Sequence, residues 1–176
     1  LEDIEEDLEK EDEEKKKEIR RMEIYAAMID RVDQNLGRVF DQLKATGKFE
    51  NTLVLFLSDN GACAEQPTKF EGDTSGDMGG VNSFPTVGPS WANVSNTPFR
   101  FYKKDSYEGG INTPMIAHWP KGIQQKGAFS RETCHLIDIL PTCVELAGAT
   151  FPGESPTPDI NPPDGVSLSP SFSGIP

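Results

Sequence analysis

The stretch TLVLFLSDNGACAE, residues 52–65, decides the fold. Residues 53–57 are apolar without a break, a pattern typical of an interior strand that is covered on both faces, as in a parallel sheet. We therefore predict a buried strand over 53–58. The polar residues Asp59 and Asn60 follow it directly, ahead of Gly61.

This polar corner is a candidate metal site. In open α/β sheets, ligands bind beyond the carboxyl ends of the strands, and hard cations such as Ca²⁺ or Mg²⁺ prefer oxygen ligands. The side chains of Asp59 and Asn60 both offer oxygen, and Gly61 allows the backbone to turn sharply behind them. The alternative is a plain turn, because Asn-Gly is a favoured turn dipeptide. The next residues, ACAEQPTK, do not continue as a second alternating strand.

A long amphipathic helix is predicted ahead of the strand. From residue 19 to residue 43, apolar side chains recur at spacings of three and four, with Asp33 as the one exception, which is one stripe of a helix. Thr46 and Gly47 supply its stop, and the first dozen residues are expected to fray. We predict that the 18–46 helix packs on the sheet face. A helix, a short loop and a buried strand in succession indicate an α/β layer fold.

Composition excludes some functions. The 176-residue chain carries a net charge of −12, which repels nucleic-acid phosphates and anionic membranes, so we expect neither partner. No stretch is long enough to span a bilayer. The three cysteines form no CxxC pair, which argues against a disulfide framework or a cysteine-rich zinc site. We expect Cys134 and Cys143 to be small buried hydrophobes.

The second half is less regular. Residues 61–98 are rich in glycine, and so long a connection is usually functional or disordered. TPMIAHWP, residues 113–120, is a second short apolar run. DILPTCVELAG predicts a helix with Asp138 as N-cap and Gly148 at the C′ position. The tail from residue 151 holds seven of the 14 prolines and is expected to be irregular.

Basic residues precede a glycine pair in NTPFRFYKKDSYEGG, residues 96–110. Lysines that lead into a tight turn can hold an anionic group as point charges. The alternative is a solvated surface loop.

Three segments together resemble the type I sulfatases, in particular the bacterial arylsulfatases. They are YAAMIDRVDQNLGRVFDQLKATGKFENTLVLFLSDNG, WANVSNTPFRFYKKDSYEGGINTPMIAHWP and LIDILPTCVELAG. They occur in the family's order, and the resemblance extends from about residue 23 to about residue 170. It implies an α/β fold of the three-layer, alkaline-phosphatase-like type and the hydrolysis of sulfate esters.

The resemblance also implies roles for individual residues. Asp59 and Asn60 match the Asp-Asn pair that binds the family's Ca²⁺. Lys103, five residues before the Glu of the EGG motif, matches a lysine that contacts the sulfate and serves catalysis. Lys104 has no such counterpart. Glu108 and the two glycines after it are expected to shape the turn, and we interpret His118 as structural.

Other parts of the family's site have no match in this sequence. The nucleophile is a formylglycine made from the Cys or Ser of a C/S-x-P-S/A-R motif, and the three cysteines are followed instead by AEQP, HLID and VELA. The N-terminal acidic pair of the metal site is missing too. We therefore expect a fragment: a charged helical extension at 1–18, part of the catalytic domain at 19–150, and a Pro/Ser-rich tail at 151–176 leading to a missing C-terminal subdomain.

Two other functions stay open. A phosphodiesterase or phosphomutase of the alkaline-phosphatase superfamily is one, although those members commonly carry Asp-His at this corner, and an amide oxygen at Asn60 favours Ca²⁺. A non-catalytic pseudo-sulfatase is the other. The expected substrate is a sulfate-ester small molecule or a sulfated glycan, and by analogy the parent protein is expected to be periplasmic or secreted.

Overall fold

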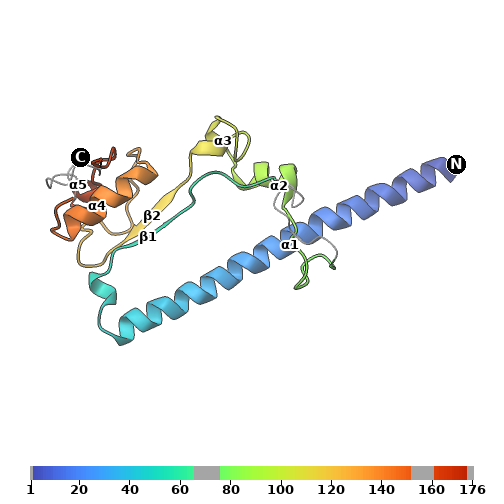
Figure 1. The fold of residues 1–176 in the computed structure, drawn as a ribbon. Coiled ribbons are helices and arrows are strands. Elements are labelled where there is room, and N and C mark those ends of the chain that lie inside the picture. The colour runs from blue at the N-terminus through green and yellow to red at the C-terminus, as the bar shows by residue number, and fades with distance from the viewer. Residues whose placement is uncertain (1, 66–75, 152–160, 174–176) are drawn as a thin grey trace. The chain divides into compact units, whose positions relative to one another are not determined.

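The computed structural model describes residues 2–65, 76–151 and 161–173. These residues form two compact units. Residues 1–42 and 57–115 belong to the first unit, and residues 43–56 and 116–176 belong to the second. Figure 1 labels the helices and strands of both units.

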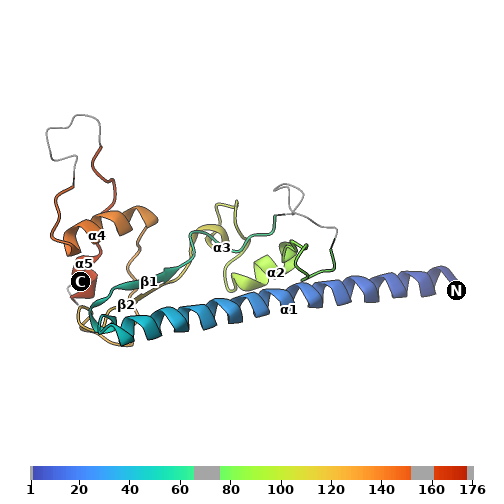
Figure 2. The same cartoon turned by 60° about the horizontal axis from the view of Figure 1, so that its bottom comes forward.

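Helix α1 (Glu2–Ala45) runs without a break for 44 residues (Figure 2). Its end is a Schellman motif, as the Thr46-Gly47 stop predicts: Gly47 N–H donates to Lys44 O at 3.0 Å and Lys48 N–H to Leu43 O at 2.9 Å. Gly47 has a positive φ of 67°, which glycine adopts without a steric penalty. The helical C-terminus is therefore confirmed.

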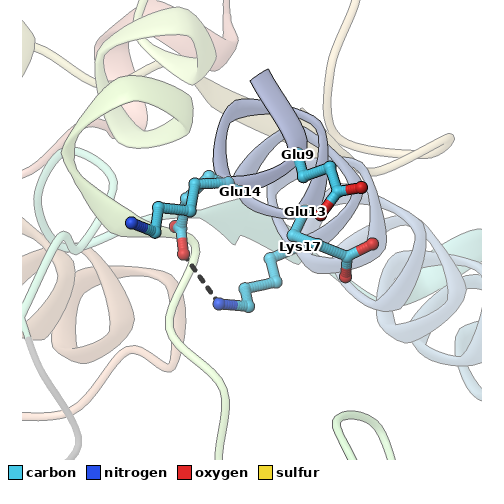
Figure 3. A pocket seen from close by; sticks show the side chains of 5 residues that line it. Glu9, Glu13, Glu14 and Lys17 are labelled. Atoms are coloured by element: carbon cyan, nitrogen blue, oxygen red, sulfur yellow. Dashed lines mark hydrogen bonds and ion pairs between the residues drawn. The ribbon is translucent and has the colours of Figure 1, made fainter. Parts of the chain in front are cut away.

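The expected fraying of the first dozen residues is not observed, because the helix begins at Glu2. Ion pairs between neighbouring turns support this end of α1: Lys16 Nζ lies 2.7 Å from Glu13 Oε1, and Lys17 Nζ lies 2.7 Å from Glu14 Oε1. Figure 3 shows the open hollow on this helix, lined by Glu9, Lys10, Glu13, Glu14 and Lys17. Only charged side chains of one helix line it, so we assign no ligand to it.

The middle of α1 packs within the first unit against α2 (Gly88–Ser95). Trp91 Nε1 donates a hydrogen bond to Glu18 O at 2.9 Å. The apolar stripe of the helix is only partly covered, because Ile19 and Ile29 are 54% and 51% exposed. Since most of α1 and most of the sheet belong to different units, the packing of this helix on the sheet face stays a prediction.

Strands β1 (Val54–Leu57) and β2 (Met115–His118) form a two-stranded sheet. They run antiparallel, because Thr113 Oγ1 donates to Ser58 O at one end, and Lys121 N–H donates to Glu50 O at the other. The predicted parallel partner is therefore wrong for this pair. The predicted burial is also wrong in this chain: Phe56 is 51% exposed. The sheet has only the strands β1 and β2 among the described residues. No further layer of described residues covers Phe56.

The second unit is organised around Asp138 and Thr142, which are 6% and 0% exposed. Asp138 is the N-cap of α4 (Ile139–Leu146) and also closes the 3₁₀ turn η3 (Leu136–Asp138). Gly148 at φ 62° ends the helix, with its N–H donating to Glu145 O at 2.9 Å. The predicted 138–148 helix is confirmed.

Three expectations about the second half need correction. Cys134 and Cys143 are exposed, not buried: Cys143 lies on a side of α4 that no other described residue covers, and Cys134 lies in the irregular segment before η3. The 61–98 segment contains a helix, α2, and its residues 66–75 lie outside the described ranges. The tail is not wholly irregular, since Ser169–Phe172 form helix α5 and Phe172 is buried.

A further 3₁₀ turn, η1, spans Phe49–Asn51 and lies between α1 and β1.

No helix among the described residues is both long enough and apolar enough to cross a membrane.

Candidate functional site

The Asp59–Asn60 corner begins two residues after the end of β1, and side chains from distant parts of the first unit hold it at both ends. Thr113 Oγ1 donates to Ser58 O at 2.7 Å, just before the corner. Ala62 N–H donates to Asn96 Oδ1 at 3.1 Å, just after it. Between these two fixed points Asp59 is exposed and Asn60 is half-buried. Their side-chain oxygens are thus carried on a fixed backbone at the end of the strand.

Helix α3 (Glu108–Ile111) lies against the same corner. Gly61 N–H donates to Gly110 O at 2.9 Å. A Cβ on Gly61 would lie 1.8 Å from Gly109 O, and a Cβ on Gly109 would lie 2.2 Å from Phe101 O. The glycines of the EGG motif therefore allow three backbone segments to lie close together. This confirms the prediction that Glu108 and its glycines shape a turn, and Glu108 itself accepts a hydrogen bond from Asn112 Nδ2 at 2.8 Å.

Lys103 is joined to the corner through the backbone. Its N–H donates to Ala62 O at 3.0 Å, three residues after Asp59. Asn96, whose side chain accepts from Ala62, also donates through Nδ2 to Phe101 O at 2.9 Å. The structure thus places the predicted sulfate-binding lysine and the predicted metal-binding pair on adjoining backbone segments of one unit.

The three basic side chains of this region have different surroundings. Arg100 stacks on aromatic rings, with its Cζ 5.3 Å from the centre of Phe101 and 5.9 Å from that of Tyr107. Lys104 forms an ion pair with Glu65. Lys103 Nζ lies 3.7 Å from Glu65 Oε2, and its side chain is 38% exposed. Of these three side chains, that of Lys103 is the one that neither stacks on an aromatic ring nor donates a hydrogen bond to Glu65.

Glu65 is the acidic partner at this site. Its side chain is 11% exposed, and the hydrogen bond from Lys104 is the main cause that lowers the pKa of the Glu65 carboxyl. The same pair raises the pKa of Lys104. Both groups therefore stay charged throughout the physiological pH range.

The oxygen atoms at the corner are of the type that a hard cation binds, but there are too few of them to complete its coordination. Asp59 and Asn60 supply carboxylate and amide oxygens, which Ca²⁺ prefers, yet Ca²⁺ takes six to eight oxygen ligands. No group of three or more His, Cys, Asp or Glu side chains suited to a metal occurs in the parts of the chain that the structure describes. A cation held here would need ligands from elsewhere.

The two histidines have structural surroundings. The ring of His118 lies 5.2 Å from that of Phe49, in agreement with the structural role expected of it. His135 accepts a hydrogen bond through Nδ1 from Ile137 N–H at 3.3 Å and so caps the turn η3.

Sequence reasoning missed three residues that build the site. Asn96 and Thr113 fix the two ends of the 58–62 segment, and Glu65 pairs with the lysines. Single polar residues in loops carry no periodic signal, so only the contacts identify them. Asn96 and Thr113 also line a hollow of about 310 Å³ together with Ser95, Thr97, Phe99, Asn112 and Pro114.

The comparisons of this chain with known proteins all point to one family. The family model described as Sulfatase matches residues 3–149. The chain is 40% identical over 152 residues to an uncharacterised sulfatase of Schizosaccharomyces pombe, covering 80% of this chain and 27% of that protein. It is 39% identical over 158 residues to an arylsulfatase of Klebsiella aerogenes, covering 84% of this chain and 34% of that protein.

A solved structure gives the same result for the fold. The crystal structure of Ps i-CgsB in complex with k-i-k-neocarrahexaose matches with a TM-score of 0.59 and 28% sequence identity, covering 86% of this chain and 26% of that one. The mixed helix and strand architecture is thus part of an alkaline-phosphatase-like fold, as the sequence predicts. The chain spans about a third or less of the length of these relatives.

Proposed function

Because this chain belongs to the sulfatase family, we propose that it is part of a longer sulfuric ester hydrolase of the arylsulfatase type. In this proposal Asp59 and Asn60 supply part of a Ca²⁺ site, and Lys103 binds the sulfate group of the substrate. Other ligands and the formylglycine nucleophile come from outside this chain. The substrate is a sulfate-ester small molecule or a sulfated glycan.

The observation that carries the proposal is the hydrogen-bonded link between the corner and Lys103. Lys103 N–H donates to Ala62 O at 3.0 Å, and Gly61 N–H donates to Gly110 O at 2.9 Å. Two segments that lie far apart in the sequence are thereby joined so closely that side chains at 61 and 109 would clash. This rigid junction supports a site in which oxygen ligands and an ammonium act on one bound group.

The chemistry of these side chains suits a sulfate ester. A sulfate ester carries one negative charge, and more develops on the bridging oxygen as the S–O bond breaks. A bound divalent cation would stabilise that charge as a Lewis acid. Lys103 adds a second positive charge that binds and orients the sulfate oxygens, and Asp59 and Asn60 would supply oxygen ligands to the cation. Electrostatic stabilisation of this kind is effective because it is built in before the reaction.

Substitutions in the full-length enzyme test the proposal. Lys103→Ala should lower turnover of an aryl sulfate by about 10²–10³-fold, the usual effect of removing one such contact. Asp59→Ala should lower turnover further and empty the metal site, because it removes a charged ligand. Asn60→Ala should weaken metal binding and be partly rescued by excess Ca²⁺. Turnover is measured alongside the bound calcium content.

Arg100→Lys is the matched control, since Arg100 stacks on Phe101 and lies in the same basic segment. It should leave the metal content unchanged and affect turnover far less than Lys103→Ala. An Asp59→Ala enzyme that keeps both its calcium and its rate would contradict the proposed site. So would a Lys103→Ala enzyme with the KM and kcat of the parent.

A further inference from the structure

Two lysines share one carboxylate beside the proposed sulfate site. The Oε1 atom of Glu65 pairs with Lys104, and its Oε2 atom lies 3.7 Å from Lys103 Nζ. The Glu65 side chain is 11% exposed, whereas those of Lys103 and Lys104 are 38% and 59% exposed. The carboxylate is therefore largely withdrawn from water, and both lysine side chains are more exposed than it is.

The two contacts differ in kind. Lys104 donates a hydrogen bond to Glu65, which is the largest cause of the lowered pKa of that carboxyl. At 3.7 Å, Lys103 is beyond hydrogen-bonding distance and feels only the electrostatic attraction of the carboxylate. Glu65 thus carries the same charge as a sulfate group and stands within reach of the lysine that is proposed to bind sulfate.

The backbone supports this arrangement at some cost. Lys104 has a positive φ of 84°, and Phe101, three residues earlier, has a φ of 65°. Residues other than glycine rarely adopt this backbone conformation, and they keep it where surrounding contacts enforce it. Successive side chains of an extended segment point to opposite sides. At the turn that contains Lys104, both lysines instead lie close to the same carboxylate.

From these contacts, and on the basis of the proposed function, we propose that Glu65 and Lys104 are positioning residues for Lys103. Glu65 is an internal anion that competes with sulfate for Lys103. Lys104 restrains it by donating a hydrogen bond to Oε1, and the Cys63 thiol donates a weaker one to Oε2 at 3.4 Å. Without Lys104 the carboxylate would turn to Lys103 and occupy the ammonium that should meet the substrate. This gives Lys104 a function, although no family counterpart was expected for it.

Sulfate binding by the 176-residue chain tests the proposal. Inorganic sulfate is titrated while the backbone and lysine side-chain NMR signals are followed, and the backbone spectrum shows whether each variant keeps its fold. Lys104→Met should weaken sulfate binding by about fivefold or more, because Glu65 is released toward Lys103. Adding Glu65→Gln to that variant should restore binding to within about twofold of the parent chain.

A charge-matched variant separates competition from a general loss of positive charge. Asp105→Asn combined with Lys104→Met has the same net charge as Glu65→Gln combined with Lys104→Met, and it leaves Glu65 in place. It should bind sulfate as weakly as Lys104→Met alone. If both double variants regain binding equally, or if Lys104→Met binds sulfate as the parent chain does, the competition proposal is overturned.

Lys103→Met distinguishes this proposal from the one it depends on. It should abolish the sulfate-induced shifts in every background. If sulfate binding survives Lys103→Met, the lysine assigned under the proposed function is wrong. If Lys103→Met abolishes binding while Glu65→Gln fails to rescue Lys104→Met, only the positioning role is wrong.

Discussion

Gly61 illustrates how a single residue can determine the site. A Cβ at this position would lie 1.8 Å from Gly109 O and 2.9 Å from Gly109 C, both backbone atoms. Since backbone cannot move aside as a flexible side chain can, Gly61→Ala should separate the corner from α3. We expect a loss of at least about 3 kcal/mol in the free energy of unfolding, at the upper end of overpacking effects. Chemical denaturation measures it.

At the same scale, Asp138 should make stability depend on pH. The N–H groups of His135 and Val166 donate to its carboxylate at 2.7 and 2.9 Å and lower its pKa. A lowered pKa in the folded state stabilises the protein above the ordinary value near 3.9, and this stabilisation disappears as pH falls below it. The denaturation midpoint of the unsubstituted 176-residue chain should therefore drop in acid.

Asp138→Asn should reduce that acid-dependent drop and lower stability at neutral pH, because an amide accepts through only one of its two polar atoms. The exposed Glu145 on the same helix provides the control variant Glu145→Gln, which should keep the pH dependence of the parent. An Asp138→Asn chain with an unchanged acid profile would show that this network does not govern the pH dependence.

At the scale of single elements, the glycine inside α1 and the glycine just after its C-terminus have opposite expected effects. Gly37 lies inside the helix, and nothing would lie within 4 Å of an added Cβ. Gly37→Ala should therefore stabilise the chain by about 0.5–1 kcal/mol. Gly47 also has open space around it but holds a φ of +67°, so Gly47→Ala should be destabilising by about 1 kcal/mol. Thermal unfolding followed by circular dichroism distinguishes the two signs.

Elements whose signals are local were predictable from the sequence. The stop at Gly47 and the helix 139–146 depend on glycine, proline and capping residues within a few positions of each other. Helix α2 was not predicted, because the 61–98 segment lacks a periodic apolar pattern and α2 depends on contacts such as that of Trp91 with Glu18. Local patterns fix helix ends better than they fix whether a short helix forms.

At the scale of the whole molecule, burial was the property that sequence predicted least well. The apolar run at 53–57 marks a strand, but the exposure of Phe56 depends on which other segments cover it. The site was partly predictable: Asp59, Asn60 and Lys103 came from a family motif, and the structure joins their segments through Lys103 N–H and Ala62 O. Glu65 could not be predicted, since its lysine partners are distant in the sequence.

The remaining prediction concerns the chain as a whole: the purified 176-residue chain should not hydrolyse sulfate esters. In the proposed function the nucleophile is a formylglycine made from a C/S-x-P-S/A-R motif, and no cysteine or serine of this chain lies in such a motif. Asp59 and Asn60 alone also offer too few oxygen atoms to hold Ca²⁺ tightly. The role proposed for Lys103 is to bind and orient a sulfate group through its positive charge, which is not the role of a nucleophile.

Turnover of an aryl sulfate by this chain, with and without millimolar Ca²⁺, checks the point. The expected rate equals that of the uncatalysed reaction in both cases, and a Lys103→Ala chain should give the same value. Calcium-dependent turnover that Lys103→Ala abolishes would contradict the prediction, because it would require a nucleophile within these 176 residues. Turnover that Lys103→Ala leaves unchanged would instead indicate a contaminating enzyme, since the proposed sulfate-binding lysine would then play no part in it.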